Sequence, residues 1–194
     1  MSKIRGTPVR VIAALAFLIA LTAASVAKTD PAFASIKIKN FGQMDDRFYR
    51  GGQPKPEDLK DLASIGIKTV INLRDDFEPW EQQAVEAAGM RYVSIPMDGH
   101  AYPSKETVNA FLKVVNDPET GKFFAHCAGG KHRTGSMGAV YRYTHDHWNY
   151  DQVYAEMKKF DFYTRFGHGD LKKFVQDYAV SFQTKQAAVA TVAQ

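Results

Sequence analysis

The sequence predicts an α/β fold in which a central, mainly parallel sheet is flanked by helices on both faces. Between residues 48 and 182, short runs rich in β-branched and aromatic residues alternate with segments of helical periodicity. Glycine or proline separates most of these segments. Alternation of this kind is typical of parallel strands joined by right-handed helical crossovers.

The first half of this region contains three predicted strands and two predicted helices. Pro56 and the two acids after it suit the first turn of a helix, and Gly66 suits its end. A second helix ends at Gly89. The strands are rich in β-branched and aromatic residues. In order, we expect a strand over 48–50, a helix over 56–66, a strand over 67–73, a helix over 80–88 and a strand over 90–95.

The second half is predicted to be mostly helical. Ser104 is a good N-cap, and the apolar residues that follow it recur at helical spacing. A short buried strand over 123–125 then leads into a glycine-containing loop. Aromatic and methionine side chains at helical spacing are most simply core residues. The expected helices cover 104–115, 134–147, 151–160 and 170–182.

The two ends of the chain differ from this central region. Three basic residues precede an uncharged apolar run over 11–24, which is the layout of a secretory signal peptide. Small residues allow cleavage after Ala27 or after Ala34, and an uncleaved membrane anchor is the alternative. We therefore expect a signal peptide over 1–34, a catalytic domain over 35–183 and a disordered tail over 184–194. The protein would be exported, periplasmic or secreted, or membrane-anchored if the leader is kept.

The charge balance argues against a nucleic-acid partner. The chain carries 25 Lys and Arg against 21 Asp and Glu, and its formal net charge is +4. Three of the basic residues precede Lys28, and from Lys28 onward 22 basic residues face 21 acidic ones, so this part is close to neutral. We expect no nucleic acid, no stable membrane contact once the leader is removed, and a monomer. The single cysteine excludes an intramolecular disulfide.

That cysteine lies in the most informative segment of the chain, which reads HCAGGKHRTG over 126–135. A cysteine thiolate is a good nucleophile when nearby cations and a helix N-terminus lower its pKa. The glycines let successive backbone N–H groups surround one anion, and Arg133 offers a planar fork of donors to two phosphate oxygens. Thr134 begins the following helix. The segment therefore predicts a site that cleaves phosphate esters.

The topology brings further polar residues to this site. Ligands of such sheets bind beyond the carboxyl ends of the strands. Cys127 follows one predicted strand at this edge, residues 74–76 follow a second, and residues 96–98 follow a third. Three loops should therefore converge there.

The 126–135 segment resembles the signature of the cysteine-dependent protein tyrosine and dual-specificity phosphatases. The resemblance implies that Cys127 is the nucleophile and that Thr134 steadies the leaving thiolate. His126, directly before the nucleophile, would tune the thiolate without contacting the substrate. The phosphoryl group would be bound by the loop residues Ala128, Gly129, Gly130, Lys131, His132 and Arg133.

The same family uses an aspartate about thirty residues before the cysteine as general acid and then as general base. Asp98 lies at this position, 29 residues before Cys127. Asp75 and Asp76 are rival candidates, and His100 is a lesser one. One carboxyl group can protonate the leaving oxygen and later activate water.

Three segments extend the resemblance over about residues 41–180 to the compact atypical dual-specificity phosphatases of plants, fungi and bacteria: YRGGQP over 49–54, NLR over 72–74 and GKHRTG over 130–135. In that group, Lys131 and His132 correspond to loop cations that suit substrates with several phosphates. Gly129 departs from the basic residue of eukaryotic members, and Asp98 departs from the glutamate of plant members. These departures put the polyphosphate preference in doubt.

Several of these polar residues have alternative interpretations. Lys131 can be a solvated charge at the loop rim, and His132 can pack against the following helix. Arg165 and His168 are expected in a surface loop, with a distant anion contact as the alternative. Arg50 is expected to pair with a carboxylate inside the fold.

We therefore predict a phosphatase that acts through a phosphocysteine, without metal or other cofactor. The leading substrate class is a phosphotyrosyl or dual-specificity protein substrate, and the alternative is an inositol (poly)phosphate or another small molecule. A phosphate-binding module without turnover is a distant alternative, since the nucleophile, the arginine and an acid are all present. A rhodanese-type sulfur transferase also uses a cysteine loop, but the Arg133-Thr134-Gly135 ending argues against it.

Overall fold

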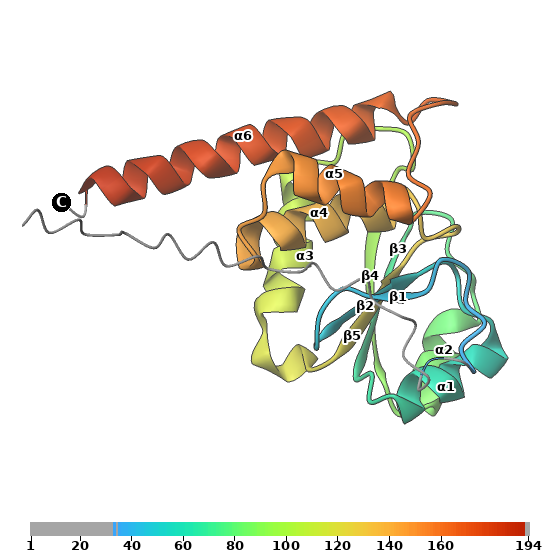
Figure 1. Cartoon of the computed structure of the whole chain (residues 1–194). Helices are drawn as coiled ribbons and strands as arrows, with labels where there is room; N and C mark the ends of the chain where they lie inside the picture. Colours follow the sequence, from blue (N-terminus) through green and yellow to red (C-terminus); the bar gives the residue numbers. More distant parts are fainter. Residues whose placement is uncertain (1–32, 34, 193–194) are drawn as a thin grey trace, which may run out of the picture.

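The computed structural model describes residue 33 and residues 35–192. They contain a five-stranded sheet with the order β1-β2-β5-β3-β4 (Figure 1). Among the described strands, β1 alone runs antiparallel, against β2, and the other neighbours are parallel. The predicted mainly parallel sheet is therefore confirmed. The strands are β1 (Gly42–Gln43), β2 (Phe48–Gly51), β3 (Thr69–Arg74), β4 (Arg91–Met97) and β5 (Phe123–His126).

Helices cover both faces of this sheet, as predicted. Figure 1 shows α1 and α2 on one side and α3 to α6 on the other. Two separate hydrophobic clusters fill the two layers. The helices are α1 (Leu59–Ser64), α2 (Glu81–Ala87), α3 (Lys105–Asn116), α4 (Arg133–His145), α5 (Tyr150–Lys159) and α6 (Gly169–Val192), with 3-10 turns η2 (Pro56–Asp58) and η3 (Pro118–Thr120).

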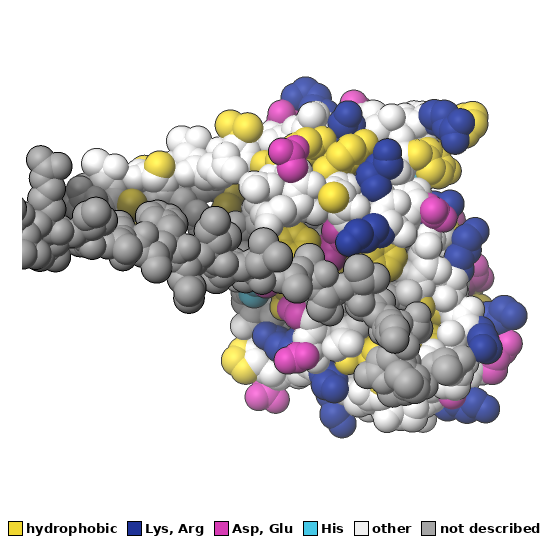
Figure 2. Space-filling view, viewed as in Figure 1, with side chains coloured by type: hydrophobic (Ala, Val, Ile, Leu, Met, Phe, Trp, Pro, Cys, Tyr) yellow, Lys and Arg dark blue, Asp and Glu magenta, His cyan; other side chains and the backbone are white. Residues whose placement is uncertain are grey.

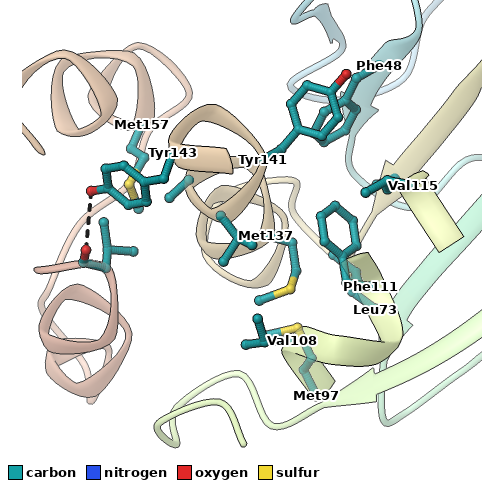
Figure 3. Close-up of a cluster of buried hydrophobic side chains, with 14 of the residues drawn as sticks. Phe48, Leu73, Met97, Val108, Phe111, Val115, Met137, Tyr141, Tyr143 and Met157 are labelled. Carbon is teal, nitrogen blue, oxygen red and sulfur yellow. Dashed lines mark hydrogen bonds between the residues drawn. The ribbon is translucent and has the colours of Figure 1, made fainter. Parts of the chain in front are cut away.

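The larger core lies between the sheet and α3 to α6, and it fixes the position of α4 (Figure 3). Met137 on α4 and Phe111 on α3 are completely buried in it. The Tyr143 hydroxyl, also on α4, donates to the Val175 carbonyl of α6 over 3.2 Å. Burial of this kind typically stabilises a fold by about 1.5–3 kcal/mol per large apolar side chain. The N-terminus of α4, where Arg133 lies, is thereby held rigidly against the sheet.

Strand β5 brings the cysteine to the edge of this core. Successive side chains of a strand point to opposite faces. Phe123, Ala125 and Cys127 therefore belong to the larger cluster, while Phe124 belongs to the smaller one. His126 shares the face of Phe124 and stacks on its ring. Cys127 consequently lies at the carboxyl end of a central strand, on the side of α4.

The final helix is longer than predicted. α6 continues to Val192, although the composition of the chain predicts a disordered tail from residue 184. Its first half is anchored through Leu171, Phe174 and Val175, which are buried. Once this part is fixed, further Ala, Gln and Lys residues extend the helix without a new nucleation step, because each has a high helix propensity. The exposed second half projects beyond the domain (Figure 1).

The predicted leader lies outside the described residues, apart from Phe33. Within the described residues, no helix has the length and apolar character needed to cross a membrane. Figure 2 shows Lys and Arg side chains interspersed with Asp and Glu over the face in view. In the part of this face that the described residues form, basic and acidic side chains are therefore mixed.

Candidate active site

The loop between β5 and α4 is wrapped so that its carbonyl groups point outward. The Ala128 carbonyl accepts a hydrogen bond from the backbone N–H of Gln53 over 3.2 Å. The Gly129 carbonyl accepts one from Asn40 Nδ2 over 3.0 Å, and the Gly130 carbonyl accepts one from Arg50 Nη2 over 2.5 Å. In a planar trans peptide, the N–H points away from the C=O. The N–H groups that follow these carbonyls therefore face the inside of the loop, where an anion binds.

Gly130 is required for this close approach. Its φ of 66° lies in the left-handed region, and a Cβ added there would lie 2.5 Å from the Gly51 carbonyl carbon. Backbone atoms cannot move away as a flexible side chain can. Gly129 has more room, because a Cβ there would meet only the Lys131 side chain at 3.7 Å. The two glycines thus have different roles, since only Gly130 seats the loop against the end of β2.

The Cys127 thiol has a pKa below its ordinary value. Burial raises the pKa, because the side chain is 3 % exposed. Hydrogen bonds from the side chain and backbone of Thr134, the charge of Arg133 and the backbone N–H of Gly129 together outweigh this effect. Each of these contacts stabilises the thiolate rather than the thiol. The loop therefore presents a buried, activated sulfur nucleophile.

Arg133 joins the three loops that the sequence predicts to converge. Its Nη1 lies 2.6 Å from Asp75 Oδ1 on the loop after β3, and 3.2 Å from the Met97 carbonyl at the end of β4. A Cβ added to Gly99 would lie 3.7 Å from Arg133 Nε. The predicted convergence is thus confirmed. Among the described residues, the hydrogen bonds of Arg133 to protein groups all use Nη1, so Nε and Nη2 remain to donate to two phosphate oxygens.

The three candidate acids lie in different surroundings. Asp98 is exposed, and its Oδ1 accepts backbone N–H groups of His100 and Ala101 over 2.7 and 3.3 Å. These hydrogen bonds, His100 first, hold its pKa below the usual range. Asp76 has a pKa lowered to about 2, chiefly by its hydrogen bond with Arg74. Asp75 is bound to Arg133. A phosphate dianion beside Asp98 would raise its pKa, whereas Asp76 and Asp75 are tied to cations.

Lys131 and His132 do not both offer free positive charge to a substrate. Lys131 Nζ lies 3.3 Å from Asp161 Oδ2 and 5.5 Å from the centre of the Tyr163 ring. His132 Nε2 lies 3.1 Å from the Tyr163 carbonyl. Burial, then the neighbouring charge of His168, lowers the pKa of His132 to about 4. His132 is therefore neutral at pH 7 and serves as a packing group.

Among the residues that the structure describes, Arg50 pairs with no carboxylate, contrary to the sequence-based expectation. It is 1 % exposed, and its guanidinium lies over the Phe160 ring at 4.1 Å while donating to the Gly130 carbonyl. Burial lowers its pKa to about 10, while the charges of Cys127 and Glu156 act in the opposite direction. Arg50 therefore stays protonated at neutral pH, and its charge interacts with that of the Cys127 thiolate. Its hydrogen-bond partner is the Gly130 carbonyl in the loop between β5 and α4. The spacing of residues in the sequence does not reveal this contact.

Glu81 was not singled out from the sequence, yet it is completely buried behind the loop. Its Oε1 lies 2.9 Å from His126 Nε2, although without the angle of a good hydrogen bond. It also accepts hydrogen bonds from Gln53 Nε2 over 2.7 Å and Asn72 Nδ2 over 2.6 Å. In the sequence it looks like an ordinary acid in the first turn of α2. The described residues contain no group of three or more His, Cys, Asp or Glu placed to hold a metal ion.

Comparison with known proteins gives one matching family and several relatives. A family model described as "DSP-PTPase phosphatase fused to NAD+ Kinase" matches residues 25–177. The probable tyrosine-protein phosphatase DG1060 of Dictyostelium discoideum is 31 % identical over 126 residues, which are 62 % of this chain and 75 % of that protein. The inositol diphosphatase DSP3 of Arabidopsis thaliana is 30 % identical over 125 residues, or 62 % of this chain and 61 % of the relative.

The fold is also shared with a solved structure. The core catalytic domain of the PP-IP phosphatase SIW14 from S. cerevisiae, in complex with citrate, superposes with a TM-score of 0.64 at 21 % identity. The match covers 79 % of this chain and 94 % of that domain. At this identity, the likeness establishes a common fold.

Proposed function

The chain belongs to the DSP-PTPase phosphatase family, and from this premise we propose that it hydrolyses phosphate monoesters through a phosphocysteine on Cys127. One observation carries the proposal. The loop combines a thiol of lowered pKa, inward-facing amides and the Arg133 guanidinium in one place. A thiolate, anion-binding N–H groups and a forked cation are the parts that phosphoryl transfer to cysteine needs.

The reaction would run in two steps. The Cys127 thiolate attacks phosphorus while the bond to the leaving oxygen breaks, and Arg133 with the loop amides binds the remaining phosphate oxygens. Asp98 donates its proton to the leaving oxygen. Water then attacks the phosphocysteine, Asp98 accepts the proton of that water, and inorganic phosphate leaves. Thr134, which donates hydrogen bonds to the sulfur, stabilises the thiolate that is released.

We propose tyrosyl phosphate on proteins as the leading substrate class. The first relative named above is a probable tyrosine-protein phosphatase. Of the two extra loop cations expected to suit polyphosphates, His132 is neutral at pH 7 and Lys131 is paired with Asp161. Inositol diphosphates are the second candidate. Lys131 Nζ supports them, because its side chain remains 23 % exposed and the Asp161 pair can open.

A hydrolysis panel with one variant separates these substrates. Wild-type protein should hydrolyse a phosphotyrosyl peptide with a higher kcat/KM than an inositol pyrophosphate. Asp161→Asn keeps a residue that tolerates the left-handed φ of 58° at this position and frees Lys131. It should raise kcat/KM for the inositol pyrophosphate about two- to fivefold, as expected for an exposed ion pair, and leave the peptide nearly unchanged.

Asp46→Asn is the matched control, since it removes the same charge from an exposed residue in the turn before β2, outside the phosphate loop. It should change neither rate. A tenfold preference of the wild type for the inositol pyrophosphate, unaffected by Asp161→Asn, would contradict the substrate assignment. Failure to hydrolyse any member of the panel would contradict the proposed function itself.

We further propose that residues 1–34 direct export, on the sequence features described above. The mature protein would then begin after Ala27 or Ala34. N-terminal sequencing of protein recovered from the periplasm or medium should give one of these two starts. Recovery from the cytosol with Met1 retained would contradict export.

A further inference from the structure

Three histidine rings form a stack that joins the Asp98 loop to the phosphate loop. The His168 ring lies 3.5 Å from the His132 ring, with 14° between their planes. On its other side, the His100 ring lies 4.6 Å away at 12°. His132 directly precedes Arg133, and His100 follows Asp98 by two residues. The middle ring comes from the segment between α5 and α6, for which the sequence predicts a surface loop.

His168 also holds the backbone of the Asp98 loop. Its Nδ1 lies 2.8 Å from the Gly99 carbonyl, so Nδ1 carries the proton and donates it. The Gly99 Cα faces Arg133, since a Cβ there would lie 3.7 Å from Arg133 Nε. The residue that His168 holds is therefore the one next to Asp98, directly above the phosphate-binding arginine.

The conformation of residues 163–168 allows the three histidine rings to pack closely. Gly167 has a φ of 87°, and a Cβ there would lie 3.1 Å from His100 Cδ2. His168 is 9 % exposed, whereas neighbouring Phe166 is 79 % exposed. His132 is fixed in turn by the carbonyl of Tyr163. Both outer rings of the stack are thus packed against the 163–168 segment.

We propose that His168 is a positioning residue for the general acid, holding the Asp98 loop over the phosphate loop through its hydrogen bond to Gly99. This inference rests on the proposed function, in which Asp98 protonates the leaving oxygen. His168 touches neither substrate nor sulfur. It limits the positions open to Asp98, and proton transfer depends steeply on that geometry.

The test compares leaving groups in three variants. His168→Ala should lower kcat/KM for a phosphotyrosyl peptide about 10- to 100-fold, a part of the full effect of a general acid. For an activated aryl phosphate, whose leaving group departs unprotonated, the loss should stay within about threefold. His168→Asn carries an amide donor close to the position of Nδ1 and should recover most of the loss. Arg165→Ala, in the same segment but exposed, is the control and should match wild type on both substrates.

A second measurement does not depend on turnover. Amide hydrogen exchange over residues 98–103 should become faster in His168→Ala than in wild type, and not in Arg165→Ala. Equal losses on both substrates, no loss on either, or no recovery in His168→Asn would overturn the positioning role, as would unchanged exchange. If the wild-type protein hydrolyses neither substrate, the proposed function fails, and the exchange result still decides whether His168 holds the loop.

Discussion

Replacement of Cys127 by serine should abolish turnover, with a loss on the order of 10⁶-fold in kcat, as found when a covalent nucleophile is removed. The contacts that hold the sulfur pKa below its ordinary value stabilise a thiolate. A serine hydroxyl in the same place stays protonated at neutral pH, because its intrinsic pKa lies far above that of a thiol. Steady-state hydrolysis of an aryl phosphate measures the effect.

The same variant should still bind phosphate. The inward-facing amides and Arg133 do not depend on the sulfur atom. Inorganic phosphate should therefore raise the Tm of Cys127→Ser about as much as that of wild type, through binding to the folded state alone. Activity within a few-fold of wild type would exclude Cys127 as nucleophile, and loss of both activity and phosphate binding would show that the substitution disrupts the loop.

Asp98→Asn should slow hydrolysis of tyrosyl or alkyl phosphates by about 10²–10⁴-fold, the usual contribution of a general acid. An activated aryl phosphate should be affected much less. The pKa of Asp98 is lowered in the free protein, so its protonated fraction falls as pH rises through the acid range. In wild type, kcat/KM for tyrosyl phosphate should therefore decline toward neutral pH, and this decline should flatten in Asp98→Asn.

Asp75→Asn is the informative control for the acid. Asp75 binds Arg133 over 2.6 Å and belongs to a different loop. Its replacement should free Arg133 for phosphate without making the rate depend on the leaving group. If Asp75→Asn instead shows the selective loss and Asp98→Asn behaves like wild type, the acid comes from the loop after β3, and the assignment to Asp98 is wrong.

The fold and the position of the loop were predictable because they depend on local patterns. Strand runs, helical periodicity and glycine stops place Cys127 at the end of a central strand, and the topology then brings residues 75–76 and 97–99 to Arg133. The α6 extension was missed because an Ala- and Gln-rich end has the composition of a disordered tail, while anchoring of its first half makes it helical.

The contacts that support the loop were not predictable in the same way. Arg50 binds a carbonyl 80 residues away, and His168 binds one 69 residues away. Neither partner has a side chain that could mark the contact in the sequence. Burial also gives two ionisable residues roles that the sequence does not indicate. Glu81 looked like a solvated first-turn acid, and His132 looked like a loop cation, but the first is buried behind His126 and the second is neutral in a ring stack.

The phosphocysteine itself gives the most direct test of the mechanism. Wild-type protein mixed with an activated aryl phosphate, quenched within the first turnover and digested, should yield one phosphorylated peptide by mass spectrometry. We predict that the phosphoryl group lies on Cys127, that it forms at the rate of the product burst, and that it is absent in Cys127→Ser. A burst without a phosphorylated peptide, or a phosphoryl group on another residue, would contradict it.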